Sequence, residues 1–452
     1  MKPTRRKFLS EAALAAAIAG VGPGVRAIVA AAGQSPRPYL DLALRCAKWI
    51  DSSAQHTASG LAWPADPLKP GSIGLDYYNG APGVVAFFAR MWEATGDAKW
   101  ADRALQGYEY LTAESARMRD ALDAGLYTGL AGLGATYFPL SVLKVGPEAG
   151  NAVMQVTKDL VRRAKNVGDG VEWSDSNDII SGTAGTGLFL LDAAERLKDA
   201  SLADLAMKAG RRLLATAVPA EGGLMWLPGG AIKANYPNFS HGTSGVAYFL
   251  ATLYQRSKEQ AFLDGALAGA KYLDAVATRR NGGRAIFHVT GGGEDRFYLS
   301  WCHGPVGTSR LFYRLLQITG DSQWRTWIDE LTTWLASSGA PEQQSAGYWN
   351  NISQCCGNVG IGQYAIDLTR HYPKPIAASL RDRVVKNTMS RAKDDEAGLR
   401  WVQAENRVSP ENLVAQTGFM QGAAGVGTFF LQLDALARGV SWSVPWPDTP
   451  WA

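Results

Sequence analysis

The chain has 452 residues, of which 46% are apolar, and its formal net charge is +4 at pH 7. An apolar fraction of this size excludes wholesale disorder, and the length suffices for one large core or for two to three ordinary domains. Glycine is frequent, with 50 residues, well above the usual level of about 7%. No glycine-rich linker absorbs this excess, so the fold itself must need the glycines.

The first segment in chain order resembles an export signal. Residues 1–32 open with MKPTRRKFLS, in which Arg5 and Arg6 form the pair typical of a twin-arginine signal. The apolar part that follows is short and is interrupted by Glu11 and Pro23, so we expect no stable membrane span. A general secretory signal and an uncleaved anchor are the alternatives.

Removal of this segment has consequences for charge and partners. Residues 1–32 hold five basic residues and one acidic residue, so the rest of the chain carries 40 of each. A nucleic-acid-binding surface is therefore not expected. The twin-arginine machinery exports folded proteins, and four cysteines in a large exported chain do not resemble a disulfide framework. We expect a periplasmic or secreted protein whose metal site is filled before export.

A Gly-x-x-Gly motif then recurs seven times. Each copy leads into an apolar helical stretch, and most are followed by a short turn and a second, amphipathic helix. The glycine pairs are Gly80/Gly83, Gly129/Gly132, Gly182/Gly185, Gly242/Gly245, Gly304/Gly307, Gly357/Gly360 and Gly422/Gly425. The sequence therefore predicts an all-α fold of about seven helical hairpins, with the first helix of each pair buried and the second outside.

Such hairpins can form an open solenoid or a closed ring. The units are long, the first helices are very apolar and no capping repeat is evident, which favours a closed α/α toroid (barrel) over a solenoid. The Gly-x-x-Gly loops would let the N-termini of the inner helices crowd around the axis. We assign residues 38–440 to this domain and residues 441–452 to a C-terminal tail.

A second motif, Gly-apolar-x-Trp, precedes several of these copies. It occurs at Gly60–Trp63, Gly170–Trp173, Gly223–Trp226 and Gly398–Trp401. It is too short for a helix, so we place it in extended structure on one rim. Each tryptophan either fills the gap between neighbouring hairpins or faces a substrate, and the sequence leaves both roles open.

The two residues before each first glycine should point into a shared mouth. These pairs are Tyr78-Asn79, Tyr127-Thr128, Ile180-Ser181, Ser240-His241, Cys302-His303, Cys355-Cys356 and Met420-Gln421. Three of the four cysteines fall at these positions, and ring closure would bring Cys302 close to Cys355 and Cys356. Three thiolates favour Zn²⁺ and leave a fourth position open, as in catalytic sites. Alternatively His303 closes a structural site, or no metal binds; Cys46 reads as a small buried apolar residue.

At these motifs the sequence resembles the lanthionine synthetase C-like family, the lanthipeptide cyclases and their relatives, over about residues 38–440. WCHG corresponds to the family's Trp-Cys-x-Gly, and CCG stands where the family usually has Cys-His-Gly. The resemblance thus implies a zinc site of Cys302, Cys355 and Cys356, in which Cys356 replaces the common histidine ligand. A three-cysteine variant of this kind exists in the family.

The resemblance also implies catalytic residues. SHG matches the family's catalytic histidine, here His241, and DIISG matches its acidic position, here Asp178. A basic residue that the family often has four positions before the first zinc cysteine is Tyr298 here, and Arg296 lies out of register. This departure puts full cyclase activity in question.

The implied activity is that of a lanthionine synthetase-like enzyme acting on a peptide or small-thiol substrate. A zinc-activated thiol adds to the β-carbon of a dehydroamino acid, and His241 protonates the α-carbon with the assistance of Asp178. Three thiolates make the zinc centre negative, which favours sulfur transfer over activation of water.

Two other functions stay open. A carbohydrate-active enzyme with the same ring architecture needs a pair of carboxylates across the mouth, for which Asp76, Glu172, Asp175 and Asp178 are the candidates. A non-catalytic ring, stabilised by zinc, could bind exported peptides.

Overall fold

The computed structural model describes residues 36–451 apart from 147, 231, 233, 292–295 and 344–347. The chain divides into Met1–Pro38 and Tyr39–Ala452, and the second unit carries the features below. The export signal expected in residues 1–32 lies outside the described residues and stays a prediction. Across the part of the chain that is described, none of the helices has the length and apolarity to cross a bilayer.

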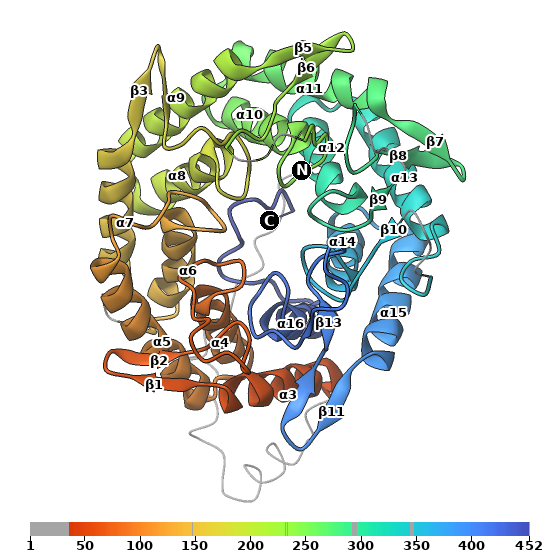
Figure 1. The fold of residues 1–452 in the computed structure, drawn as a ribbon. Coiled ribbons are helices and arrows are strands. Elements are labelled where there is room, and N and C mark those ends of the chain that lie inside the picture. Colours follow the sequence, from red (N-terminus) through yellow and green to blue (C-terminus); the bar gives the residue numbers. More distant parts are fainter. Residues whose placement is uncertain are drawn as a thin grey trace, which may run out of the picture. The chain divides into compact units, whose positions relative to one another are not determined.

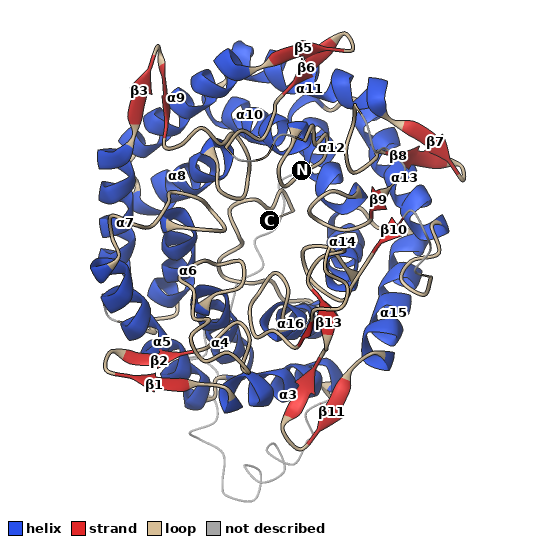
Figure 2. Cartoon of the chain, in the orientation of Figure 1, coloured by secondary structure: helices blue, strands red, loops and turns tan. Residues whose placement is uncertain are grey.

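Residues Tyr39–Ala452 form an α/α toroid, which confirms the predicted fold class (Figures 1 and 2). The inner helices are α4 (Ala81–Thr95), α6 (Leu130–Val142), α8 (Thr183–Leu197), α10 (Thr243–Ser257), α12 (Pro305–Thr319), α14 (Asn358–His371) and α16 (Ala423–Arg438). The outer helices are α3 (Pro38–Ser52), α5 (Ala98–Arg117), α7 (Ala149–Arg163), α9 (Ala200–Thr216), α11 (Gln260–Val276), α13 (Ser322–Ser337) and α15 (Pro375–Ser390). The inner helices are buried almost all round, because one side of each packs against the outer helices and the other side faces the centre of the ring.

The seventh helix pair is built from the two ends of the domain. No helix follows α16 in residues 439–451, and α3 lies outside α16 instead (Figure 1). A methyl group added at Gly427 of α16 would lie 3.2 Å from the Cβ atom of Cys46 on α3. Cys46 is fully buried in this contact, as its interpretation as a small apolar residue requires. The first helix of the domain thus closes the ring.

Backbone hydrogen bonds between neighbouring repeats complete the closure at the N-termini of the inner helices. From amide N to carbonyl O they run Tyr78 to Tyr127, Tyr127 to Ile180, Ile179 to Ser240, Ser240 to Cys302, Cys302 to Cys355, Cys355 to Met420 and Met420 to Tyr78. Their lengths lie between 2.8 and 3.1 Å. Apart from Ile179, which lies three positions before Gly182, the circuit runs through the residues two positions before each first glycine, so it holds the predicted mouth residues at fixed places.

The second glycine of the motif is required by close packing. A Cβ atom on Gly307 would lie 1.9 Å from the carbonyl oxygen of Trp301 and 2.6 Å from the Cβ atom of Phe239. We expect Gly307→Ala to lower the free energy of unfolding by about 3 kcal/mol or more, measured by urea denaturation. Gly71→Ala is the control, because its Cβ atom would meet nothing within 4 Å. Equal stability of the two variants would contradict this account.

Short antiparallel β-hairpins stand at the outer edge of the ring (Figure 2). They pair β1 (Gln55–Thr57) with β2 (Gly60–Ala62), β3 (Lys165–Val167) with β4 (Gly170–Glu172), β5 (Val218–Ala220) with β6 (Gly223–Met225), β7 (Thr278–Arg280) with β8 (Gly283–Ala285) and β11 (Lys393–Asp395) with β12 (Gly398–Arg400). In the first hairpin Gln55 pairs with Ala62. Two further pairs join β9 (Phe297–Tyr298) in parallel with β10 (Tyr348–Trp349), and β13 (Gln403–Ala404) in antiparallel with β14 (Leu413–Val414).

The Gly-apolar-x-Trp motifs form the second strands of four of these hairpins. Trp226 and Trp401 are buried, and their indole N–H groups donate to the carbonyl oxygens of Leu213 and Thr388 at 2.7 and 2.8 Å. Trp63 is also fully buried. These tryptophans therefore fill gaps between repeats, and they do not form a substrate-facing rim.

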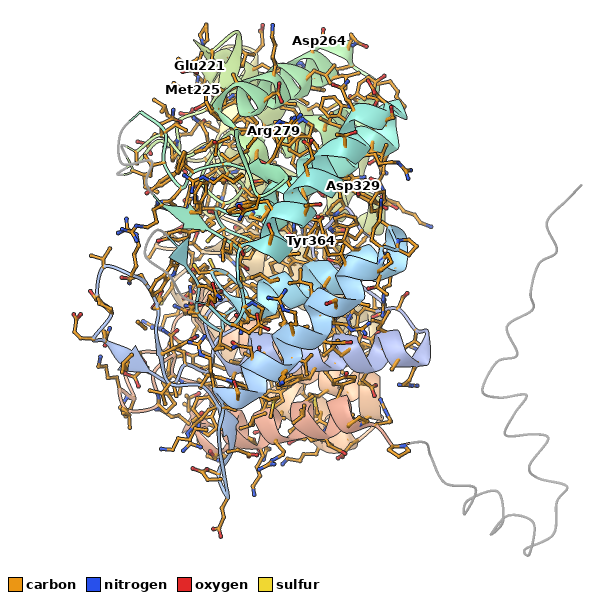
Figure 3. The ribbon with its side chains drawn as sticks, turned by 90° about the vertical axis from the view of Figure 1, so that its right-hand side faces the viewer. Glu221, Met225, Asp264, Arg279, Asp329 and Tyr364 are labelled. Atoms are coloured by element: carbon orange, nitrogen blue, oxygen red, sulfur yellow. The ribbon has the colours of Figure 1, made fainter. Side chains whose placement is uncertain are left out.

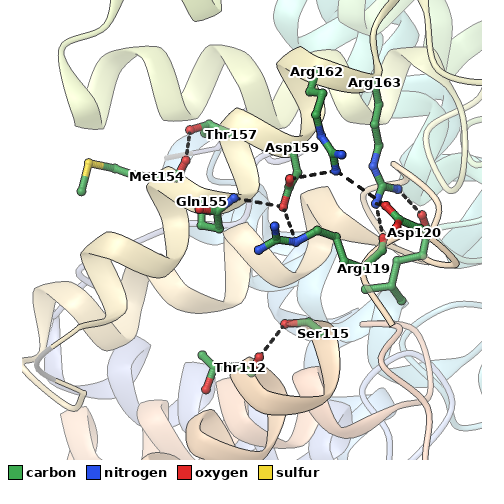
Figure 4. Close-up of polar contacts among 11 residues, drawn as sticks. Thr112, Ser115, Arg119, Asp120, Met154, Gln155, Thr157, Asp159, Arg162 and Arg163 are labelled. Atoms are coloured by element: carbon green, nitrogen blue, oxygen red, sulfur yellow. Dashed lines mark hydrogen bonds and ion pairs between the residues drawn. The ribbon is translucent and has the colours of Figure 1, made fainter. Parts of the chain in front are cut away.

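Polar contacts join helices within and between the layers. The hydroxyl groups of Tyr364 on α14 and Thr332 on α13 lie 2.8 Å apart across the two layers (Figure 3). In the outer layer, Asp159 of α7 accepts from Arg162 one turn later and pairs with Arg119 at 3.3 Å (Figure 4). These contacts fix the loop after α5 against α7.

Residues 441–451, assigned from the sequence to a tail, run into the central bore (Figure 1). The Asp448 side chain is buried there and forms an ion pair of 2.6 Å with Arg310 of α12. Its second oxygen accepts hydrogen bonds from the Tyr127 hydroxyl at 2.8 Å and the Trp301 indole at 3.1 Å. The segment therefore belongs to the core.

Candidate metal centre

The three cysteines predicted to bind metal meet at the N-termini of α12 and α14. The Sγ atom of Cys356 lies 3.4 Å from that of Cys302 and 3.5 Å from that of Cys355. All three sulfur atoms lie within 4.8 Å of one another, and all three residues are buried. Sulfur atoms that bind one zinc ion tetrahedrally at about 2.3 Å lie about 3.8 Å apart. The spacing and the soft donor set therefore fit one zinc-sized ion.

The three thiols can all be thiolates in this buried place only if a cation is bound beside them. Burial raises the pKa of the Cys302 and Cys355 thiols, whereas the hydrogen bonds from those two thiols lower the pKa of Cys356. Three thiolates in this space need a positive charge. Helix dipoles supply part of it, because the cysteines precede the N-termini of α12 and α14.

Two neighbours of the cluster were not predicted to contribute to the site. The Tyr78 hydroxyl lies 3.0 Å from the Sγ atom of Cys355, and the Gln421 side-chain amide donates to that hydroxyl at 2.8 Å. Both residues stand among the pairs before the first glycines, so the alignment of repeats was the signal that could have found them.

The predicted acid–base residues form a pair across repeats three and four. The Nδ1 atom of His241 lies 2.5 Å from Oδ2 of Asp178, whose side chain is fully buried. The other oxygen of Asp178 accepts from the backbone N–H groups of Ser181 and Gly182. This fixes the carboxylate, which holds Nδ1 of His241 and leaves Nε2 for exchange with a ligand.

His303 does not belong to the sulfur cluster. Its Nε2 atom lies 3.4 Å from the Ser240 hydroxyl, and the described metal-binding group comprises the three cysteines without it. Its ring lies 5.8 Å from that of His241 and 4.5 Å from that of His288. Burial lowers the pKa of His303. The structure therefore favours a three-sulfur centre with His303 beside the mouth over a closed site with His303 as ligand.

A ring of aromatic and histidine side chains surrounds His303. Tyr236 lies 4.6 Å and Tyr298 lies 5.6 Å from its ring centroid. Burial, helped by the charges of Arg407 and Arg296, lowers the pKa of His288 to about 4, so His288 is neutral at pH 7. Sequence patterns assign no role to Tyr236 or His288, because their loops carry no repeated motif.

The Arg407 side chain brings a positive charge to the position where the family often has a basic residue. Tyr298 stands there; burial raises its pKa, and the charge of Arg407 and a hydrogen bond with it offset part of that rise. Arg407 lies in the loop between β13 and β14, more than one hundred residues further along the chain. The spacing of Arg296 relative to Cys302 could not reveal this contact.

Three of the four carboxylates considered for a carbohydrate-active enzyme are engaged with other groups. Glu172 forms an ion pair of 2.6 Å with Arg212, and Asp178 holds His241. Asp76 accepts from the backbone N–H of Asn79. Among the described contacts, none joins two of these four carboxylates.

A cavity of about 490 Å³ lies deeper in the bore. It is bordered by Trp446, Asp448 and Trp451 of the C-terminal segment and by Arg310 and Asp367 of the inner helices. Its lining contains none of the three cysteines and neither His241 nor Asp178. We place the candidate site at the sulfur cluster because its thiols are grouped there and the backbone of Ser240, next to His241, bonds to that of Cys302.

Comparisons with known proteins identify the family and the fold. The chain matches the family model described as lanthionine synthetase C-like protein over residues 71–444. Nisin cyclase superimposes with a TM-score of 0.62 and 14% identity, covering 91% of this chain and 95% of that chain. The α-1,6-mannanase GH76A of Salegentibacter sp. HEL1_6 gives 0.49 and 14%, covering 88% and 99%. A sugar epimerase from a ruminal bacterium gives 0.48 and 12%, covering 90% and 98%. A search of curated proteins gives no match.

Proposed function

Because the chain belongs to the lanthionine synthetase C-like family, we propose that it is a zinc enzyme that adds a thiol to a dehydroamino acid and so forms a thioether in a peptide. The observation that carries this proposal is the meeting of Cys302, Cys355 and Cys356 at one point of a mouth that also holds the His241–Asp178 pair. The fold shared with nisin cyclase supports a peptide substrate.

The three cysteines would hold Zn²⁺ and leave one coordination position for the substrate sulfur. When bound, the ion lowers the pKa of that thiol, so that a thiolate is present at neutral pH. The sulfur forms a bond to the β-carbon, and the electron pair of the double bond moves to the α-carbon and its carbonyl.

His241 completes the addition. It takes up the proton that the thiol loses and delivers a proton from Nε2 to the α-carbon, so the net change is addition of S–H across the double bond. Asp178 accepts the hydrogen on Nδ1 and stabilises the imidazolium between the two transfers. The rings of Tyr236 and His303 lie 6.1 and 5.8 Å from that of His241 and border the place of this transfer.

Metal content tests the proposal directly. We expect about one zinc ion per chain in the purified protein, and less than about a tenth of that in Cys302→Ala, because two remaining thiolates bind zinc far more weakly. Elemental analysis measures the metal, and the mass of a dehydroalanine peptide incubated with a thiol measures the addition. Cys46→Ala is the matched control, since Cys46 is a buried cysteine on α3, and it should keep both properties. A zinc-free wild type, or full zinc in Cys302→Ala, would refute the proposal.

We also propose that residues 1–32 direct the folded, metal-loaded protein through the twin-arginine machinery. The support is the Arg5-Arg6 pair and its context in the sequence. Changing both arginines to lysine should retain the protein in the cytosol with its zinc bound, as measured by cell fractionation and elemental analysis. Unchanged export of the lysine variant would indicate a general secretory signal.

A further inference from the structure

The first and last repeats of the toroid both reach the sulfur cluster. Tyr78, from the loop before α4, places its hydroxyl 3.0 Å from the Sγ atom of Cys355. Gln421, from the loop before α16, places Nε2 2.8 Å from the Tyr78 oxygen and 4.0 Å from the Sγ atom of Cys356. The sulfur atoms themselves belong to repeats five and six, so four repeats contribute to one centre.

The hydrogen bonds among these residues are all donated in one direction, toward the sulfur cluster. The Oε1 atom of buried Gln421 accepts from the Nδ2 atom of buried Asn351 at 3.4 Å, which turns the Gln421 amide nitrogen toward Tyr78. Because that nitrogen donates to the Tyr78 oxygen, the hydroxyl hydrogen of Tyr78 is free to point at Cys355. The series from Asn351 through Gln421 and Tyr78 therefore ends as a donor on sulfur.

A donor at this place answers an electrostatic need of the cluster. Three thiolates on a divalent ion leave a net negative charge in a buried site, and a fourth sulfur from a substrate would add to it. Hydrogen bonds to thiolates disperse this charge and fix the orientation of the sulfur atoms.

We propose that Tyr78 and Gln421 are positioning residues of the metal centre: Tyr78 holds Cys355 as a thiolate ligand by donating a hydrogen bond to its sulfur, and Gln421 orients that donor. The inference rests on the proposed metal site, but it does not require thiol addition. Since the donors come from repeats one and seven, the centre is complete only when the ring is closed, and metal binding should stabilise that closure.

Tyr78→Phe tests this proposal, because it removes the donor and keeps the ring. We expect zinc affinity to fall about 10- to 100-fold, measured by competition with a chromogenic chelator. In the cobalt-substituted protein the thiolate-to-cobalt absorption should shift to lower energy, because the sulfur loses a hydrogen bond. Gln421→Leu should give a smaller change in the same direction, and the double variant should resemble Tyr78→Phe, since both act through one series.

Tyr236→Phe is the matched control, since it removes a hydroxyl from the same mouth, where the ring lies beside His303. Its zinc affinity and cobalt spectrum should equal those of the wild type. The metal-free forms of wild type and Tyr78→Phe should unfold at the same temperature, which separates positioning from a folding defect. If Tyr78→Phe loses affinity only because its metal-free form is destabilised, and Gln421→Leu has no effect, the inference is wrong.

Two further results distinguish this inference from the proposed enzymatic function. Unchanged zinc affinity and cobalt spectrum in Tyr78→Phe would overturn the positioning role, even if thiol addition became slower. Conversely, a wild type that binds zinc and depends on Tyr78 for affinity, but adds no thiol to a dehydroalanine peptide, would sustain the inference and refute the enzymatic proposal.

Discussion

Replacing His241 with alanine is expected to lower the rate of thiol addition by about 10²- to 10⁴-fold, with zinc content and the free energy of unfolding unchanged. The imidazole is partly exposed to the mouth, and its Nδ1 atom is held by buried Asp178 at 2.5 Å. It is therefore placed to exchange protons through Nε2, and alanine leaves no group to do so. The rate is measured with a dehydroalanine peptide and a thiol by mass spectrometry.

The Asp178→Asn variant extends this test to the tautomer of His241. Oδ1 of Asp178 accepts from the N–H groups of Ser181 and Gly182, so the oxygen of an asparagine amide must occupy that side. Its NH₂ group would then face Nδ1 of His241 and donate to it, which places the neutral imidazole's proton on Nε2 and leaves the imidazolium without its partner. We expect a loss of about 10²-fold or more, again with zinc retained.

His56→Ala is the control for both variants, because His56 is an exposed histidine on β1 at the outer edge of the ring. It should keep the wild-type rate. A His241→Ala protein with full turnover would show that another group delivers the proton, and His303 would be the next candidate because its ring lies 5.8 Å from that of His241. A protein that binds zinc but is equally inactive with and without His241 would favour the peptide-binding alternative.

The repeats made much of this architecture predictable. Even spacing of Gly-x-x-Gly gave the inner helices, and the positions before Gly304 and Gly357 gave the three sulfur atoms, because every copy of the motif places the same backbone at the axis. The pairing of His241 with Asp178 came from a family resemblance and not from spacing, since 63 residues separate them. Their 2.5 Å contact depends on how two repeats pack together.

Features that depend on closure could not be read from local patterns. The amphipathic pattern of residues 38–52 indicates a helix, but not that α3 covers α16, whose residues lie near the other end of the domain. The same holds for Tyr78, whose contact with Cys355 spans 277 positions. Residues 441–451 show no regular spacing of apolar residues that would predict a buried helix or strand. Asp448 of this segment is buried against Arg310, and only the folded ring brings the two together.

Loss of the Asp448 carboxylate is expected to be among the most destabilising single changes of a charged side chain in the toroid. Asp448 and Arg310 form a buried ion pair, with side chains that are 3% and 8% exposed. In Asp448→Asn the Arg310 guanidinium stays buried and loses its ion-pair partner, and only the charge of Asp367, whose pKa burial raises to about 7, still acts on it. The asparagine amide also has one acceptor oxygen, where Asp448 has two, so it cannot serve Arg310, Tyr127 and Trp301 together.

We therefore expect Asp448→Asn to lower the free energy of unfolding by about 3–5 kcal/mol, measured by urea denaturation. Asp120→Asn is the control, because Asp120 is 90% exposed and lies 3.7 Å from Arg162; it should change stability by less than about 1 kcal/mol. The double variant Arg310→Met with Asp448→Leu should recover part of the loss, since it removes both buried charges. If Asp448→Asn is as stable as the control, the ion pair between the C-terminal segment and Arg310 does not stabilise the toroid.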